Sequence, residues 1–475
     1  MPEPAAAALE VTATTGVTGT VTAHRDAGPE DLVELATRLA GAARPGEELE
    51  VYVSRGVKTD VRAYDGEVES LSSASSAGVG IRVLRGGRQG FAYAGSVDDK
   101  VAAETLADAR DNMAFATSDP HVALAVPDGV AAVRLDVWDE AVLATPTSRK
   151  VEMALELERL TRAADSRVRQ VSSADYGDMA TEAAIATSTG IVAASRRTVC
   201  SVVTEAIAGE GADSQSGYGF SAARGPGDVD LAHAAADATE RAVRMLGATK
   251  AKSGRCVVIL DPRVASTLLS VVSSALSGEA VQKGRSMFAG RLGEQVAVAG
   301  VTLVDDPTDT RAFGASTYDA EGLACRRNAL IESGVLRGFV YDSTSARRAG
   351  TASTGSAVRG GYASTPGAGC RALLLTPGTL TQEEVLMEVG EGFFVQSVTG
   401  VHSGVNAVSG DFSVGAEGLM VRDGVLAEPV GEVTIASTLQ RMLQSLLYIG
   451  SDVEWLPGIT AGQTLAIDGM SLSGT

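Results

Sequence analysis

The sequence predicts an α+β protein, with an N-terminal α/β half and a β-rich, barrel-like C-terminal domain. In the first half, alternating strand patterns are joined by hairpin signals at Asp65-Gly66 and Gly86-Gly87, and helical patterns flank them. Beyond Arg291, short strand patterns with Gly and Asp turns dominate the chain. Glycine is abundant, at 54 of 475 residues, which is typical of a chain with many turns. These observations predict two helix–antiparallel-meander–helix units followed by a curved sheet or barrel.

The first predicted unit covers residues 28–117 and follows a segment, residues 1–27, that we expect to be a mobile leader. Its first helix is predicted over residues 29–43, because proline favours the first helical turn and apolar residues follow at helical spacing. Five short strands are predicted within residues 49–94 from their alternating pattern. A second helix, predicted over residues 98–116, ends the unit.

The second predicted unit covers residues 130–247 and repeats this order of elements. A helix is predicted over residues 148–164, strand segments within residues 167–222, and a helix over residues 229–246. The stretches that lead into the last helix of each unit are also alike. We therefore expect two copies of one α/β unit in an N-terminal domain of residues 28–247, although a common order of elements can recur by chance.

The C-terminal domain is predicted over residues 253–475. A buried strand at residues 256–260 is followed by Asp261-Pro262, which read as a helix N-cap and a first-turn proline. The helix that they begin is predicted to continue to Lys283. A last helix is predicted over residues 439–448, where apolar residues recur on one face.

The chain carries a net charge of −19, from 40 Lys and Arg against 59 Asp and Glu. Binding to nucleic acid or to an anionic membrane surface is driven by Lys and Arg, so the charge argues against both partners. No apolar stretch approaches about 18 residues, so no membrane span is predicted. The N-terminus lacks a signal-peptide pattern and the four cysteines form no CxxC pair, which predicts a cytoplasmic protein with reduced thiols.

The four histidines, His24, His121, His233 and His402, lie far apart in the sequence. No two of them can share a helical turn, which excludes a zinc-binding helix of the HExxH or HExxxH type. The sequence also lacks a GxxxxGK[ST] phosphate loop and a GxSxG nucleophile motif. A catalytic triad needs only one histidine and stays possible; Cys370 with His402 is such an alternative, although nothing in the sequence shows that they meet.

Several stretches, taken in their order along the chain, resemble the TldD/PmbA family. The resemblance covers approximately residues 30–472, and its strongest part lies near the C-terminus. The order of the pieces carries the resemblance, because no single piece is diagnostic. The pieces are Ser76–Leu84 with Gly87–Ala92, Asp261-Pro262 before a helix, Asp305–Thr308, Ser353–Ala357, Val405–Ser413 with Gly415–Gly418, Pro429-Val430, Glu432–Ala436 and Ile449–Asp452.

The resembling family has members of two kinds. TldD-like members carry an HExxxH helix and a later Cys as zinc ligands, and they act as metallopeptidases. TldE-like (PmbA) members lack these ligands and pair with a TldD-like subunit. In this chain Gly278 and Lys283 occupy the two His positions, Asn406 occupies the Cys position, and only Glu279 matches the motif. The resemblance therefore implies a TldE-like member without metal ligands, in which Glu279 marks a vestigial catalytic position.

Three residues near the missing Cys position are candidates for substrate binding: His402, Asn406 and Asp411. The alternatives are an ordinary loop histidine and, for Asp411, a role in turn hydrogen bonding. Glu279 and Lys283 have the spacing of an i,i+4 ion pair, which is the structural alternative to any catalytic role for Glu279. Glu279 alone could act as a general base only if it had an activated partner.

The resemblance implies a non-catalytic subunit of a heterodimeric zinc metallopeptidase, which completes a chamber for extended or unfolded peptides. Members of the family trim unfolded peptides or mature ribosomally made ones. The expected partners are a TldD-like HExxxH subunit, which would hold the zinc, and a peptide substrate; no cofactor is expected in this chain. Two alternatives remain: a stand-alone hydrolase or biosynthetic enzyme with a non-standard site, and a regulatory binding protein, since the family has been linked to DNA gyrase modulation.

Overall fold

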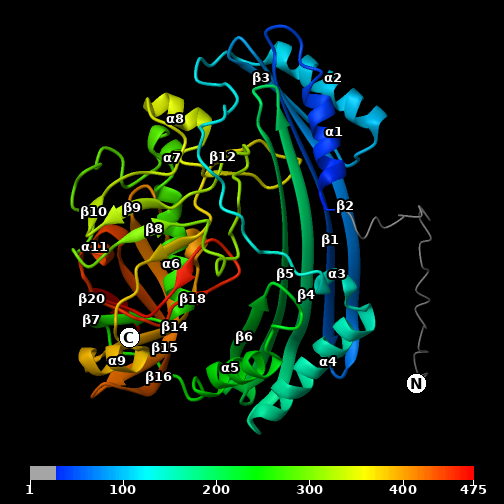
Figure 1. Ribbon diagram of the computed structural model, residues 1–475. Coiled ribbons are helices and arrows are strands. Elements are labelled where there is room, and N and C mark those ends of the chain that lie inside the picture. The colour runs from blue at the N-terminus through cyan, green and yellow to red at the C-terminus, as the bar shows by residue number, and fades with distance from the viewer. Residues whose placement is uncertain (1–27) are drawn as a thin grey trace, which may run out of the picture.

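The computed structural model describes residues 28–475, so the leader predicted at residues 1–27 lies outside the described residues (Figure 1). A long antiparallel sheet with helices on its outer face stands beside a β-rich C-terminal part that contains a closed barrel (Figure 1). The predicted α+β fold class is confirmed. Within the described part of the chain, no helix combines the length and the apolar character needed to cross a membrane.

The N-terminal sheet has six strands in the order β3-β2-β1-β4-β5-β6, all antiparallel. Its two halves meet where β1 pairs with β4, and each half has the order helix, three strands, helix. The bounds of the domains and repeat units stay a prediction. The elements are α1 (Glu30–Ala40), β1 (Glu48–Tyr64), β2 (Glu67–Arg85), β3 (Arg88–Ala94), α2 (Asp99–Phe115), α3 (Ala141–Ala144), α4 (Thr147–Ala164), β4 (Val168–Thr187), β5 (Val192–Ala208), a 3₁₀ turn (Gly211–Asp213), β6 (Gln215–Ala223) and α5 (Leu231–Val243).

Side-chain alternation separates the two faces of this sheet. Val51 and Val61 of β1 are buried on the face that the helices cover, in two clusters formed with α1 and α2 and with α4 and α5. On β5, Cys200 belongs to the same covered face. Arg197 and Val199 of β5 therefore point to the opposite face, toward the C-terminal part.

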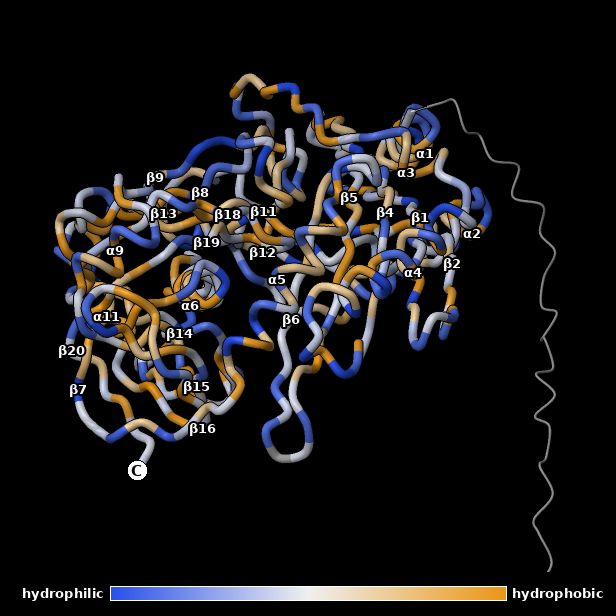
Figure 2. The backbone as a smooth tube through the Cα atoms, turned by 90° about the horizontal axis from the view of Figure 1, so that it is seen from below, coloured by the Kyte–Doolittle hydropathy of each residue, from blue (hydrophilic) through white to orange (hydrophobic). Residues whose placement is uncertain are grey.

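The C-terminal part is built around a closed five-stranded barrel. Strands β16 (Val425–Thr438), β15 (Asp411–Arg422), β14 (Gly392–Thr399), β7 (Gly254–Leu260) and β20 (Leu465–Ser473) pair in that order, and β20 pairs again with β16 to close the barrel. Strands β7 and β14 run parallel, while the other barrel pairs are antiparallel. Helix α6 begins directly after β7, with Asp261 as its N-cap, and packs its apolar face into the core between the barrel and β19 (Figure 2).

The remaining elements surround this barrel. They are β7 (Gly254–Leu260), α6 (Pro262–Ala275), α7 (Gly278–Gln282), β8 (Leu303–Asp305), β9 (Asn328–Glu332), β10 (Val335–Leu336), α8 (Ser343–Ala349), β11 (Ala357–Val358), β12 (Gly367–Ala368), β13 (Leu373–Leu375), α9 (Gln382–Val389), β14 (Gly392–Thr399), α10 (Val401–Gly404), β15 (Asp411–Arg422), β16 (Val425–Thr438), α11 (Leu439–Gln444), β17 (Leu446–Ile449), β18 (Glu454–Trp455), β19 (Ala461–Gly462) and β20 (Leu465–Ser473).

Three expectations about single elements are wrong. The short strands predicted within residues 49–94 are three longer ones, because β1 and β2 stay paired through Gly56 and through the serine-rich stretch 72–76. The helix predicted to reach Lys283 breaks after α6, where Ser277 adopts an extended backbone conformation before α7 begins. The last helix ends at Gln444, and the chain continues as β17, which pairs with β20.

The hairpin signals behave as predicted. Asp65 and Gly66 both have positive φ angles, of 52° and 80°, and join β1 to β2. Gly86 and Gly87, at 59° and 74°, join β2 to β3. Two consecutive residues with positive φ form the tight turn that matches the twist of the flanking strands, and glycine adopts it without steric cost.

Candidate functional site

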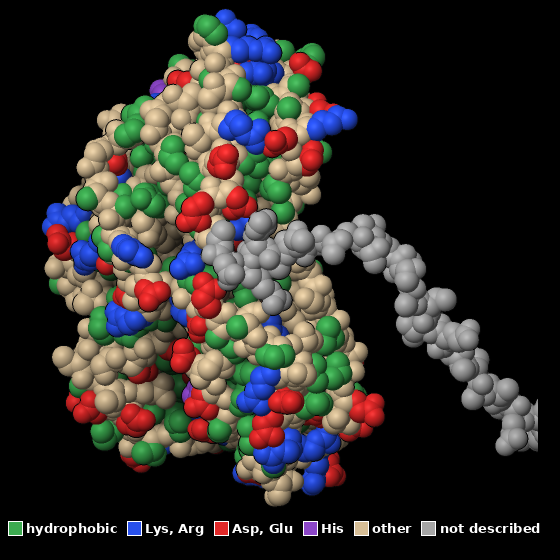
Figure 3. Space-filling model, turned by 45° about the vertical axis from the view of Figure 1, so that its right-hand side comes forward, with side chains coloured by type: hydrophobic (Ala, Val, Ile, Leu, Met, Phe, Trp, Pro, Cys, Tyr) green, Lys and Arg blue, Asp and Glu red, His purple; other side chains and the backbone are tan. Residues whose placement is uncertain are grey.

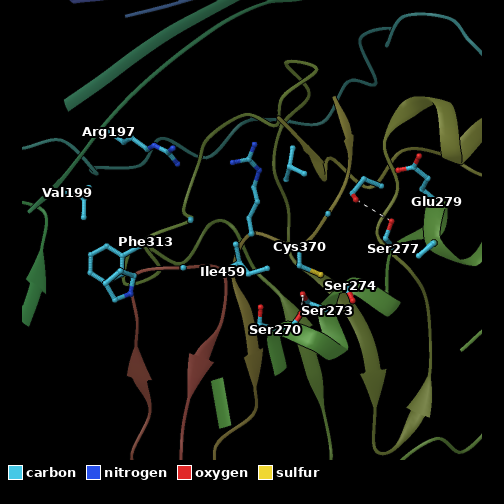
Figure 4. Close-up of a pocket in the computed structure, with 18 of the residues that line it drawn as sticks. Arg197, Val199, Ser270, Ser273, Ser274, Ser277, Glu279, Phe313, Cys370 and Ile459 are labelled. Atoms are coloured by element: carbon cyan, nitrogen blue, oxygen red, sulfur yellow. Dashed lines mark hydrogen bonds between the residues drawn. The ribbon is translucent and has the colours of Figure 1, made fainter. Parts of the chain in front are cut away.

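A partly open cavity of about 840 Å³ lies between the uncovered face of the N-terminal sheet and the α6–α7 segment (Figure 4). Its volume falls within the range of about 300–1,000 Å³ that is common for ligand sites. In Figure 4, Arg197 reaches in from β5, whereas Glu279 lies on the opposite side of the cavity. The lining residues are Met179, Arg197, Thr198, Val199, Arg224, Ser270, Ser273, Ser274, Ser277, Glu279, Ala280, Lys283, Arg285, Phe313, Gly314, Val358, Ala368, Gly369, Cys370, Arg371, Pro457, Gly458 and Ile459.

A row of serines from α6 and the residue after its C-cap lines one wall. Ser270, Ser273 and Ser274 have i, i+3 and i+4 spacing, which places them on one face of α6, and Ser277 follows beyond the end of that helix. Three of the hydroxyls donate to nearby carbonyl oxygens: Ser273 to Ser270, Ser274 to Val271 and Ser277 to Ala368. Their protons are thus used internally, and their oxygen lone pairs remain available as acceptors.

The lining contains five cationic side chains, from Arg197, Arg224, Lys283, Arg285 and Arg371, and a single carboxylate. That carboxylate, on Glu279, forms an ion pair with Lys283. The cavity therefore has an excess of positive charge, although the chain as a whole carries a charge of −19.

The arginines at the sheet side of the cavity have no carboxylate in ion-pair contact among the described residues. Arg224 donates to the carbonyl oxygens of Thr198, at 3.3 Å, and of Ala312. Arg371 donates to the carbonyl oxygen of Ala357 at 3.1 Å, and its Nε is buried without a hydrogen-bond partner in the described chain.

The surroundings of these arginines disfavour their charge. Burial lowers the pKa of Arg197, and the charge of Arg371 lowers it further. Burial lowers the pKa of Arg224 as well, and Arg197 adds to that effect. Arg197 lines the cavity and stays exposed, whereas Arg224 and Arg371 are half-buried.

The positions expected for zinc ligands do not fit a zinc ion. Gly278 is buried and has no donor side chain, and a Cβ at this position would lie 2.1 Å from Cε1 of Tyr341. Lys283 is an ammonium that pairs with Glu279, so the predicted i,i+4 ion pair is present. Asn406 uses its Oδ1 to accept from the backbone N–H groups of Val408 and Ser409. In the described residues, no group of three or more His, Cys, Asp or Glu is placed to hold a metal ion.

The three residues predicted to bind substrate lie on the exposed segment from α10 to the start of β15, and none of them lines the cavity. The structure brings Asn406 and Asp411 together, since the N–H of Asn406 donates to the carbonyl oxygen of Asp411 at 2.9 Å. The carboxylate of Asp411 accepts from Ser409, in agreement with the turn alternative. His402 is exposed on α10. Substrate binding by these three residues stays a prediction.

Cys370 lies in the lining, but His402 does not. Burial raises the pKa of the Cys370 thiol well above its ordinary value, which disfavours the nucleophilic thiolate. The geometry therefore gives no support to the Cys370–His402 pair.

Sequence reasoning missed the arginines and serines of the cavity. One signal was available: Arg197 lies out of step with the buried positions Thr198 and Cys200 of the same strand, so its side chain points away from the helices. The spacing of the serines was a second signal. No signal in the sequence shows that Arg224 and Arg371, from two distant loops, join Arg197 at one cavity.

Family models of the PmbA/TldA metallopeptidases match three successive parts of the chain. The model of domain 1 matches residues 49–113, that of the central domain residues 140–246, and that of the C-terminal domain residues 253–474. The chain is 28% identical over 439 residues to the metalloprotease PmbA of Escherichia coli O157:H7, with 92% of this chain and 94% of that protein covered.

Solved structures of similar fold agree with this match. A Thermotoga maritima protein described as a candidate modulator of a DNA gyrase superposes with a TM-score of 0.85 and 25% identity, over 93% of this chain and 99% of that one. TldE from Thermococcus kodakarensis superposes with a TM-score of 0.83 over 94% of this chain and 100% of that one; at 22% identity, this likeness shows the fold alone.

Proposed function

Because the chain belongs to the PmbA/TldD metallopeptidase family, we propose that it is the non-catalytic, TldE-like subunit of a heterodimeric zinc metallopeptidase. One observation carries this proposal: the positions that hold zinc ligands in TldD-like members are occupied here by groups that cannot bind the ion. Gly278 is packed against Tyr341, Lys283 is paired with Glu279, and Asn406 is engaged in a turn.

The donor chemistry supports this reading. Zinc takes three or four nitrogen, sulfur or oxygen donors at about 2.0–2.3 Å, and an ammonium repels the ion. A zinc ion held by the HExxxH partner would supply the activated water for peptide hydrolysis. In this chain the carboxylate of Glu279 forms an ion pair with Lys283 and has no set of zinc ligands beside it among the described residues.

The chain's own contribution is a wall of the substrate chamber. The uncovered face of the N-terminal sheet and the α6–α7 segment enclose the cavity, which is large enough for several groups of a peptide. We expect the peptide to lie there in an extended form, because main-chain hydrogen bonds then give affinity with little dependence on sequence. In this arrangement the partner cuts the peptide and the present chain holds it.

The test is proteolysis by the purified chain, by an HExxxH-bearing relative encoded in the same genome, and by their mixture. We expect degradation of an unfolded protein such as casein in the mixture alone. A partner variant with its motif glutamate replaced by glutamine serves as the control and should leave the mixture inactive. Proteolysis by the lone chain would overturn the proposal and favour a stand-alone enzyme on the same scaffold.

A further inference from the structure

Three guanidinium groups from separate parts of the chain converge on the cavity. Arg197 comes from β5, Arg224 follows β6, and Arg371 precedes β13. All three line the same cavity of about 840 Å³. We call these three residues the arginine cluster.

The cluster differs from the arginines elsewhere on the surface. On the face of the molecule seen in Figure 3, acidic and basic side chains lie side by side. Many of the other arginines have carboxylate partners, for example Arg62 with Asp175 at 2.7 Å and Arg159 with Glu156 at 2.7 Å. In the described chain Arg197 has neither a hydrogen-bond acceptor nor an ion-pair partner.

Two carboxylates interact with the charge of Arg371, those of Asp305 and Asp319, but both accept hydrogen bonds from backbone N–H groups. Asp305 is buried and accepts from the backbone N–H groups of Arg371 and Ala372, both at 2.8 Å, rather than from the guanidinium. Asp319 accepts from the backbone N–H groups of Glu321, Leu323 and Ala357. Neither carboxylate neutralises the side of the cluster that faces the cavity.

Like charges held together in a partly desolvated site oppose folding unless a counter-charge arrives. The fold nevertheless keeps these three cations at the cavity, so an anionic ligand group would relieve their repulsion. Guanidinium groups bind planar carboxylates in a bidentate manner, with hydrogen bonds that are shorter and stronger than those between neutral groups.

The remaining lining indicates which anion fits. Apolar side chains, among them Met179, Val199, Phe313 and Ile459, stand beside the arginine cluster, and the serine row lines another wall. A small inorganic anion would leave these apolar and polar walls without a partner. A peptide brings a charged group, apolar side chains and backbone N–H donors at once.

We propose that the arginine cluster binds a carboxylate of the peptide, either its free C-terminus or an acidic side chain. This inference rests on the proposed function, since it assigns the substrate group that this subunit recognises. Arg197 is the central residue, because it has no other partner within the described chain and its side chain reaches into the cavity (Figure 4). The cluster thus adds a preference for peptides with a carboxylate to the main-chain binding, while hydrolysis takes place in the partner.

The test uses one extended peptide in four forms that combine a C-terminal acid or amide with an internal Glu or Gln. Binding of each labelled peptide is measured by fluorescence anisotropy, with the full-length chain alone and with the assembled heterodimer. We expect one carboxylate form to bind about 10- to 100-fold more tightly than its neutral counterpart, as removal of a charged hydrogen-bond partner predicts. The pair that shows the preference identifies the source of the carboxylate.

Arg197→Gln should abolish this preference and leave binding of the neutral peptide unchanged. Arg197→Lys should restore part of it, because lysine keeps the charge but loses the planar fork. The matched control is Arg196→Gln, on the neighbouring residue. Arg196 lies outside the cavity, pairs with Glu140 at 3.4 Å and stacks over Trp138, so its loss should not change the preference.

Equal binding of acid and neutral peptides by the wild-type chain would overturn the inference, as would an absence of binding to both the chain and the heterodimer. Equal loss of preference in the Arg196 and Arg197 variants would also overturn it. The mass and zinc content of the same samples keep the two proposals separate. A zinc-loaded heterodimer without carboxylate preference refutes only the arginine cluster, whereas preference in a chain that forms no heterodimer refutes only the subunit role.

Discussion

Tyr341 occupies the space that a side chain at position 278 would need. Its ring atoms Cε1 and Cδ1 lie 2.1 and 2.2 Å from the site of a Cβ on Gly278, closer than any real Cβ contact. Gly278 also donates its N–H to the carbonyl oxygen of Val340 at 2.9 Å, which fixes the backbone there. A histidine at this position therefore requires both a new side chain and a displaced tyrosine.

We expect Gly278→Ala to lower the free energy of unfolding by about 1–3 kcal/mol, the usual cost of overpacking. Alanine favours a helix over glycine, so a loss of stability would report the clash and not the local helix preference. Urea unfolding of Gly278→Ala, Tyr341→Ala and the double variant measures the coupling, and the loss should largely disappear in the Tyr341→Ala background. Gly300→Ala is the control, because no atom lies within 4 Å of its added Cβ. An unchanged stability of Gly278→Ala would contradict this packing.

Replacement of Arg197, unlike that of Gly278, is expected not to destabilise the protein. The replacement removes a cation that Arg371 repels, and it breaks no hydrogen bond of the described chain. Without ligand, Arg197→Gln should leave the melting temperature unchanged or raise it, as is common when a binding residue is replaced. Differential scanning calorimetry tests this, and a clear fall in melting temperature would show that Arg197 has a structural partner.

Among the elements, α6 depends on one aspartate for two contacts. Asp261 caps the helix by accepting from the N–H of Arg263 at 3.0 Å, and it pairs with Arg241 of α5 at 2.8 Å. Asp237 of α5 completes the link by pairing with both Arg241 and Arg263. The N-terminal helix layer and the first helix of the C-terminal part are therefore joined at a cap.

Asp261→Ala should lower the free energy of unfolding by about 3–5 kcal/mol, because it leaves the mostly buried Arg241 without one of its carboxylates. Asp261→Asn should cost less, since asparagine is a good N-cap residue. Chemical denaturation of both variants gives the two values. If alanine and asparagine cost the same, the helix cap contributes nothing and the whole loss comes from the ion pair with Arg241.

The sequence predicted helices and tight turns better than long strands and distant contacts. The N-terminal helices, such as that expected over residues 148–164 and found as α4, follow from local apolar spacing. Helix α6 breaks before α7 because Ser277 bridges to Val340, a contact made by residues far along the chain. Strand β17 takes the place of the expected end of the last helix because its residues pair with β20. Such pairing is invisible to a local pattern.

The candidate site shows the same limit. The motif positions Gly278, Glu279 and Lys283 could be placed from the sequence, and Glu279 of α7 pairs with Lys283, the C-cap of that helix. Tyr341, which fills the space beside Gly278, comes from a segment 63 residues away and carried no signal. The arginine cluster likewise forms only when β5, the end of β6 and the segment before β13 meet.

Over the chain as a whole, a buried ionic network joins the N-terminal sheet to the C-terminal part. Glu50 of β1 pairs with Arg82 of β2 and with Arg359. Burial opposes the charge of Glu50, but the two arginines lower its pKa to about 2. Glu321 joins the network at 3.9 Å from Arg82. Burial and the neighbouring Asp319 raise the pKa of Glu321 to about 7, against the opposing influence of Arg82. The network thus holds one carboxylate charged and one largely protonated below neutral pH.

This network predicts how stability depends on pH. A carboxyl whose folded pKa lies above its unfolded value, here about 7 against 4.5, stabilises the fold at low pH, and this contribution disappears as the pH rises through 7. Glu321→Gln should therefore be more stable than wild type at pH 8, by about 1–3 kcal/mol, and this difference should shrink toward pH 5. Urea unfolding across this range tests it, with the surface variant Glu332→Gln as control. A difference that grows as the pH falls would contradict the assignment.

The most direct test of the subunit role is native mass spectrometry of the chain mixed with its HExxxH-bearing relative, with zinc counted for each species. We expect a heterodimer that carries one zinc ion, and a lone chain that carries none. The ion should stay with the heterodimer when Glu279 of this chain is replaced by glutamine, because this chain holds no ligand to it. A lone chain that binds zinc stoichiometrically, or a zinc ion that is lost with Glu279, would contradict the non-catalytic role.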